Sequence, residues 1–171
     1  MTNEFARKVK EWSNPDWIFY QADHADGSDI VGKFLTYGRR LVTEGVGATI
    51  RKAIESGVID HAKHSNTESG HINRNARNPD EYVVCWYSSD NRDRLQSLAE
   101  FLVENGMVRK TQGGRLYNIA FKYDSQTRAG EYGEGFVAEI KLADFIDLDT
   151  GKPKNDTGAS EREQSENRTG V

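Results

Sequence analysis

The short stretch Tyr82–Tyr87 (YVVCWY) constrains the fold of this chain more than any other feature. Side chains in a strand point alternately to its two faces, and here the side chains on both faces are apolar or aromatic. A strand of this kind lies at the centre of a sheet, or its second face lines a pocket. The stretch therefore predicts a central strand in which Trp86 and Tyr87 point to opposite faces.

The rest of the pattern predicts further strands and two main helices. Apolar residues three and four positions apart predict helices over residues 43–56 and 90–106, with Asp90 as the N-cap of the second. The same spacing between Phe5 and Trp12 predicts a short helix near the start. These elements predict an α+β fold, in which a mostly antiparallel sheet of about six strands has the helices on one face. The strands are expected at residues 17–21, 31–37, 58–65, 82–87, 116–123 and 136–142.

Residues 147–171 differ in composition from the rest of the chain. Only Leu148, Ala159 and Val171 are apolar in this segment, and none of its residues is aromatic. This is too little apolar surface to offset the entropy that the segment would lose on ordering. We therefore expect a single domain at residues 1–146, followed by a disordered polar tail.

Charge and cysteine content exclude several classes of function. The net charge of −4, from 23 basic and 27 acidic residues, argues against binding of polyphosphates by bulk charge but leaves room for a local basic pocket. The single cysteine, Cys85, excludes an internal disulfide framework and a cysteine-rich zinc module. No apolar run approaches the ~20 residues of a membrane span, and the first residues lack the apolar core of a secretory signal. We expect a soluble cytoplasmic protein without a membrane partner.

Three histidines, His61, His64 and His71, lie close together in the sequence and raise the question of a zinc site. If residues 58–65 are extended, His61 and His64 point to opposite faces of the strand. His71 falls in a polar loop with no neighbouring ligand of fixed position. We therefore predict neither a metal site nor any other cofactor.

Basic residues at strand ends suggest phosphate binding. Lys63, near the end of one predicted strand, can neutralise a phosphate as a point charge. With His64 beside it, Lys63 can also take part in proton transfer if burial lowers its pKa. Lys33 follows Gly32 at the start of another strand, without the spacing of a phosphate-binding P-loop. The alternative for each lysine is an exposed, solvated side chain.

The segment 121–135 (FKYDSQTRAGEYGEG) carries the densest set of polar side chains that suit a ligand. Lys122 and Asp124 share one side of the predicted strand, and Thr127 and Arg128 follow them. Arg128 can form a bidentate contact with a phosphate or a carboxylate, and the glycines let the backbone approach a ligand. The alternative is a long hairpin with a Lys–Asp pair on its surface.

Several motifs in order resemble a known family: VGKFLTY, AKHS, YVVCWYSSD, ENGMV and FKYDSQTRAGEYG. Together they are similar to the family of the basophilic-leukaemia-expressed protein, whose members are also described as phosphothreonine lyase domain proteins. The resemblance covers residues 16–142 and implies a fold similar to the messenger-RNA cap-binding initiation factor, a curved antiparallel sheet with helices on its convex face. Phe34 stands where we would expect tryptophan, and residues 66–80 are a polar insertion. The matching positions are Gly32, Lys33, Ala62, Lys63, Ser65, Tyr87, Asp90, Lys122, Asp124, Thr127, Gly130 and Tyr132.

Three functions follow from these residues. The first is binding of a phosphorylated ligand, a nucleotide or an RNA end, on the concave face of the sheet, with Tyr87 stacking on a base. The residues expected at that site are Lys33, Lys63, Tyr87, Lys122, Asp124, Thr127 and Arg128.

The second function is a carbon–oxygen lyase that eliminates phosphate from a phosphothreonine peptide, with Lys63 as base, His64 as acid and Arg128 on the phosphate. The third is a protein-interaction adaptor that uses the tail and the polar loop. Convergence of the basic side chains in space would favour the first two functions over the third.

Overall fold

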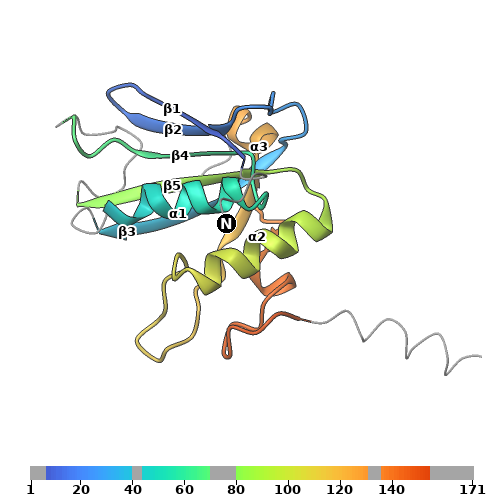
Figure 1. Cartoon of the computed structure of the whole chain (residues 1–171). Helices are drawn as coiled ribbons and strands as arrows, with labels where there is room; N and C mark the ends of the chain where they lie inside the picture. Colours follow the sequence, from blue (N-terminus) through green and yellow to red (C-terminus); the bar gives the residue numbers. More distant parts are fainter. Residues whose placement is uncertain (1–6, 40–43, 70–79, 131–135, 155–171) are drawn as a thin grey trace, which may run out of the picture.

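The computed structural model describes residues 7–39, 44–69, 80–130 and 136–154, and in it seven strands form one antiparallel sheet (Figure 1). The order across the sheet is β1-β2-β4-β5-β3-β6-β7, so β5 is the middle strand, as its two apolar faces predict. The strands are β1 (Val9–Ser13), β2 (Trp17–Ala22), β3 (Gly32–Arg39), β4 (His61–Ser65), β5 (Glu81–Ser88), β6 (Ala120–Tyr123) and β7 (Ile140–Lys141).

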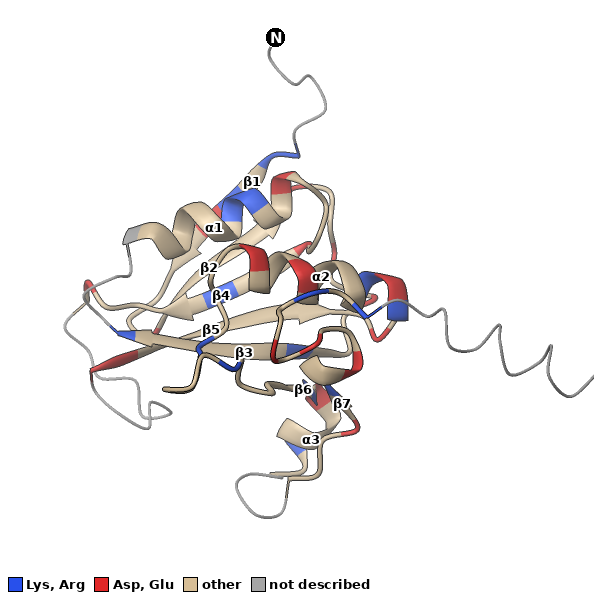
Figure 2. Ribbon diagram, turned by 90° about the horizontal axis from the view of Figure 1, so that it is seen from below, with Lys and Arg blue, Asp and Glu red and all other residues tan. Residues whose placement is uncertain are grey.

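Two helices cover one face of the sheet. Helices α1 (Glu44–Glu55) and α2 (Arg92–Glu104) lie side by side on that face, whereas the short helix α3 (Asp124–Arg128) lies on the other side, next to β6 (Figure 2). The α+β architecture is therefore confirmed, but the helices do not all share one face. No helix in the described part of the chain combines the length and the apolar character that a membrane span requires.

The core lies between the sheet and the helices α1 and α2. Trp86 and Phe34 project from neighbouring strands and are fully buried, as are Ile50 of α1 and Leu98 of α2. The indole nitrogen of Trp86 donates a hydrogen bond to the hydroxyl of Thr36 at 2.8 Å, so this buried polar group has a partner.

Four local predictions need correction. The start of the chain forms the edge strand β1 rather than a helix, because Val9–Ser13 pairs with β2 along its length. Strands β6 and β7 are shorter than the predicted 116–123 and 136–142, because the chain turns into α3 after Tyr123 and into a 3₁₀ helix at Leu142–Asp144.

The fourth correction concerns the start of α2. Asn91, not Asp90, is its N-cap, and the Asn91 side chain accepts a hydrogen bond from the backbone N–H of Arg94 at 3.1 Å.

The folded domain also continues beyond the predicted boundary at residue 146. Leu148 is buried, and its carbonyl accepts a hydrogen bond from the backbone N–H of Leu116. The carboxylate of Asp147 accepts backbone hydrogen bonds from Asp149 and Thr150, which fixes a tight turn. Residues 147–154 are therefore folded, although their composition predicted otherwise. Residues 155–171, the rest of the expected tail, lie outside the described residues.

Candidate functional site

Three lysines from three strands project from the face of the sheet opposite α1 and α2. This face is called the lysine face below, and Lys33, Lys63 and Lys122 are called the lysine cluster. In the strand register, Lys33 lies directly opposite Tyr87 on β5 and directly opposite Lys122 on β6. Lys63 lies opposite Cys85, two residues before Tyr87 on the same face of β5. Directly opposite residues point to the same side of a sheet, so the pairing brings all three lysines to one face.

Lys33 is held by a carboxylate from α3. Its Nζ lies 2.5 Å from Oδ1 of Asp124, the first residue of that helix. The Nζ also lies 5.4 Å from the centre of the Tyr87 ring. The Lys33 side chain is only 12% exposed, so this ion pair is shielded from water and fixes the position of the ammonium group.

Lys63 contacts aromatic rings instead of a carboxylate. Its Nζ lies 4.0 Å from the centre of the Trp17 ring and 5.8 Å from that of Phe19. Among the described residues, no carboxylate lies within 4.0 Å of this nitrogen. Burial lowers the pKa of Lys63 and the charge of Lys33 lowers it further, while Cys85 and Asp124 act in the opposite direction.

Lys122 is the most buried of the three lysines, with 8% exposure. Its Nζ lies 5.1 Å from the centre of the Phe136 ring, in the segment that follows α3. Lys122 and Lys33 are two like charges directly opposite each other on neighbouring strands, an arrangement that is unfavourable without an anion. Asp124 brings a negative charge to the cluster through its ion pair with Lys33.

Neutral side chains lie between these charges. Burial raises the pKa of the Cys85 thiol and that of the Tyr87 hydroxyl, so both groups remain protonated at neutral pH. The His61 ring meets the Tyr87 ring edge-on at 5.1 Å, and burial lowers the pKa of His61, which favours its neutral form. The middle of the lysine face is therefore occupied by uncharged side chains.

The other predicted site residues lie in different places. Thr127 is half-buried in α3, and its hydroxyl has no hydrogen-bond partner among the described residues. Arg128 is exposed in the last turn of α3. No ion pair or ring contact joins it to the cluster in the part of the chain described. The structure therefore brings Lys33, Lys63, Lys122, Tyr87 and Asp124 together but does not place Arg128 among them.

His64 lies on the other face of the sheet from Lys63. It is 5% exposed, its Nε2 lies 3.0 Å from the hydroxyl of Tyr20, and its Nδ1 lies 2.9 Å from the carbonyl of Ser65. Adjacent residues of a strand point to opposite faces, so the sheet separates the His64 ring from Lys63. The pairing of Lys63 as base with His64 as acid is not available in this geometry.

His61 and His64, the two described members of the histidine group, do not come together on one face. His61 and His64 point to opposite faces, as the extended segment predicts, and His71 lies outside the described residues. Within the described ranges, no three side chains of His, Cys, Asp or Glu are grouped closely enough to hold a metal ion.

Sequence reasoning did not assign Trp17, Phe19 and His61 to the site. The signal for His61 was present, because in His61–Ser65 (HAKHS) the alternation places it on the same face as Lys63. Trp17 and Phe19 join the face only because β2 pairs with β4, a contact between distant parts of the chain.

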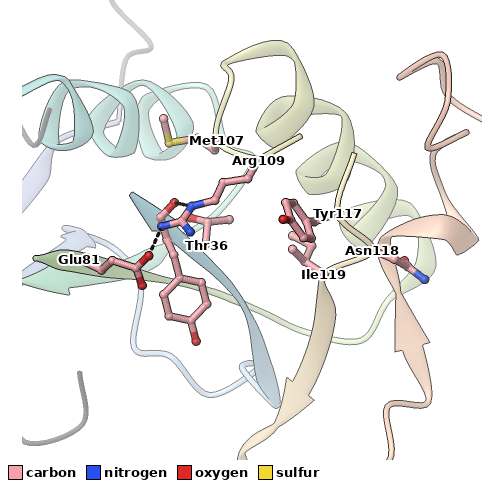
Figure 3. A pocket seen from close by; sticks show the side chains of 8 residues that line it. Thr36, Glu81, Met107, Arg109, Tyr117, Asn118 and Ile119 are labelled. Atoms are coloured by element: carbon pink, nitrogen blue, oxygen red, sulfur yellow. Dashed lines mark hydrogen bonds and ion pairs between the residues drawn. The ribbon is translucent and has the colours of Figure 1, made fainter. Parts of the chain in front are cut away.

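A hollow lies beside the end of β3 (Figure 3). Its volume is about 390 Å³. Arg109 crosses it, donating hydrogen bonds to the carbonyl of Tyr37 and to the carboxylate of Glu81, both at 2.9 Å. Tyr117 and Ile119 form the opposite wall. In this hollow the guanidinium of Arg109 is paired with the carboxylate of Glu81.

No family model matches the sequence, and neither a curated protein nor a solved structure gives a match.

Proposed function

We propose that the lysine face binds a phosphorylated ligand, a nucleotide or an RNA end, with the lysine cluster on the phosphate. The observation that carries this proposal is the placement of three lysines, from three different strands, on one face of the sheet. The seven-stranded sheet is compatible with the cap-binding-factor-like fold that the family resemblance implies, and we include that fold in the proposal.

The like charges of the cluster supply the driving force. Lys33 lies opposite Lys122, and its charge lowers the pKa of Lys63. A dianionic phosphate bound among the three lysines would reduce the repulsion between their charges and accept charge-assisted hydrogen bonds from them. The lysines reach the face from rigid strands, which lowers the entropy lost on binding. Only a few lysines contact the phosphate of the ligand, so the binding affinity should fall only modestly as the salt concentration rises.

The aromatic side chains beside the cluster suit the unphosphorylated part of the ligand. Trp17 and Phe19 flank Lys63, and Tyr87 lies between Lys33 and His61. Planar groups such as nucleobases pack against aromatic side chains of this kind, with about 1–3 kcal/mol per stacked base. This combination of rings and cations favours a nucleotide over inorganic phosphate alone.

A thermal-shift panel tests the proposal. The ligands are inorganic phosphate, mono- and dinucleotides, a methylated cap analogue and a phosphothreonine peptide. A ligand at 100 times its Kd adds about 2.7 kcal/mol of stability, which for a domain of this size raises Tm by roughly 5–10 °C. We expect such a shift with a phosphorylated ligand and its loss in Lys63→Gln.

Lys52→Gln is the matched control. It removes one positive charge from α1, on the other side of the sheet, where Lys52 contacts only the Asn105 side chain among the described residues. An equal loss of the shift in both variants would mean that net charge, rather than the lysine face, binds the ligand. Absence of a shift with every ligand, in folded protein, would overturn the proposal and favour the adaptor function. Release of phosphate from the peptide would replace binding with the lyase activity.

A further inference from the structure

We propose that Lys63 is a nucleophilic amine that condenses with the carbonyl group of a phosphorylated aldehyde or ketone held on the lysine face. The inference rests on the proposed function, because the rest of the lysine cluster would hold the phosphate while Lys63 forms the covalent bond. It narrows the class of ligand to one that carries both a phosphate and a reactive carbonyl.

The geometry separates Lys63 from the other two lysines. The Nζ of Lys33 forms an ion pair with Oδ1 of Asp124 at 2.5 Å, and the Lys122 side chain is almost fully buried. Lys63 is half-buried and its nitrogen lies against Trp17 and Phe19. Among the described residues it has no carboxylate within ion-pair distance. Its amine is therefore the one in the cluster that combines access with the absence of an acidic partner.

The surroundings of Lys63 favour the neutral amine that a nucleophile requires. Burial, the largest effect, and the neighbouring charge of Lys33 lower the pKa of Lys63, whereas Cys85 and Asp124 raise it, and the net shift is downward. Burial and a nearby cation are the two effects that activate lysines in enzymes that form imines. The Trp17 ring acts in the other direction because it favours a cation.

The reaction balances without an oxidant, a reductant or a metal ion. The lone pair of the Lys63 nitrogen attacks the carbonyl carbon, and one proton of the nitrogen passes to the carbonyl oxygen to give a carbinolamine. The hydroxyl group then leaves as water together with the second proton of the nitrogen, and a carbon–nitrogen double bond remains. The phosphate stays intact and bound to Lys33 and Lys122 throughout.

Pyridoxal 5′-phosphate is the probe, because it carries an aldehyde and a phosphate on a planar ring. The full chain is incubated with the probe at pH 7, reduced with borohydride, digested and mapped by mass spectrometry. We expect Lys63 to carry more label than each exposed lysine, because burial lowers its pKa, an effect that exposed lysines lack. Equal labelling of Lys63 and the exposed lysines would overturn the inference.

Lys63→Arg separates covalent capture from phosphate binding. Arginine keeps the positive charge and the ring contact, but its guanidinium stays protonated and forms no imine. We expect this variant to lose the label and to keep the rise in Tm with inorganic phosphate, whereas Lys52→Arg should keep both.

Two outcomes distinguish the inference from the proposed function. A rise in Tm with pyridoxal 5′-phosphate, without an adduct on Lys63, would overturn the inference and leave phosphate binding intact. Pyridoxal without its phosphate gives the converse test. If it labels Lys63 as strongly as the phosphorylated probe and phosphate causes no rise in Tm, the amine is reactive but the phosphate site is overturned.

Discussion

Gly32 is the position at which one added methyl group should disturb both the fold and the lysine face. A Cβ at this residue would lie 2.6 Å from the backbone carbonyl oxygen of Lys122, and 2.6 and 2.8 Å from two atoms of the Phe121 ring. Ordinary contact begins at 3.4 Å, so β6 would have to move by about 0.8 Å away from β3. Because the obstacle is backbone rather than the end of a flexible side chain, we expect Gly32→Ala to cost about 3 kcal/mol, the upper end for overpacking.

Urea unfolding followed by tryptophan fluorescence measures this cost. Gly45→Ala is the matched control, because a Cβ at Gly45 meets nothing within 4 Å and the residue lies in the first turn of α1. Alanine favours a helix over glycine, so the control should gain about 0.5–1 kcal/mol. The displacement of β6 should also weaken phosphate binding, because it moves Lys122 away from Lys33. An unfolding midpoint for Gly32→Ala equal to that of the parent would refute the packing argument.

Three further predictions concern stability. Thr36→Val should cost about 1–3 kcal/mol in urea unfolding, because it leaves the buried indole N–H of Trp86 without its acceptor; no loss would mean that Trp86 finds another partner. Burial lowers the pKa of His64 in the folded protein below its usual 6.5, so the unfolded chain takes up the proton first and stability should fall as pH drops below about 6.5. His64→Gln should reduce the slope of unfolding free energy against pH but leave the part of the slope that comes from His61, whose pKa is also lowered by burial. An unchanged slope would contradict the assignment of this pH dependence to His64. Asn91→Ala should lower stability by about 1 kcal/mol through loss of the α2 N-cap, whereas Asp90→Ala should not remove that cap.

Some features of the fold could be predicted because they depend on neighbouring residues. The alternation in Glu81–Ser88 predicted that Trp86 and Tyr87 point to opposite faces, and the structure places Trp86 in the core. The same rule put His61 and His64 on opposite faces. The helices α1 and α2 follow from apolar spacing, and the observed bounds differ from the predicted ones by a few residues.

Other features were wrong or missed because distant contacts decide them. Val9–Ser13 has the apolar spacing of a short helix, but pairing with β2 makes it an edge strand. No apolar residue follows Leu148 until Ala159, yet the hydrogen bond to Leu116 and burial hold its segment in place. The sequence around Asp124 suggested that Lys122 and Asp124 share one side of a strand and form a surface pair. In the structure the chain turns into α3 at Asp124, and its carboxylate pairs with Lys33 instead.

The sequence by itself determined which residues face each side of a strand, because the alternation of side chains is a property of the local backbone. It therefore identified Lys33, Lys63 and Lys122 as separate candidates. Only the tertiary structure decided that they lie on one face, since this depends on the order and register of strands up to about ninety residues apart in the chain. The same pairing placed Trp17 and Phe19 beside Lys63 and left His64 on the opposite face. Charges that are far apart in the sequence become one site only when hydrogen bonds between strands fix their register.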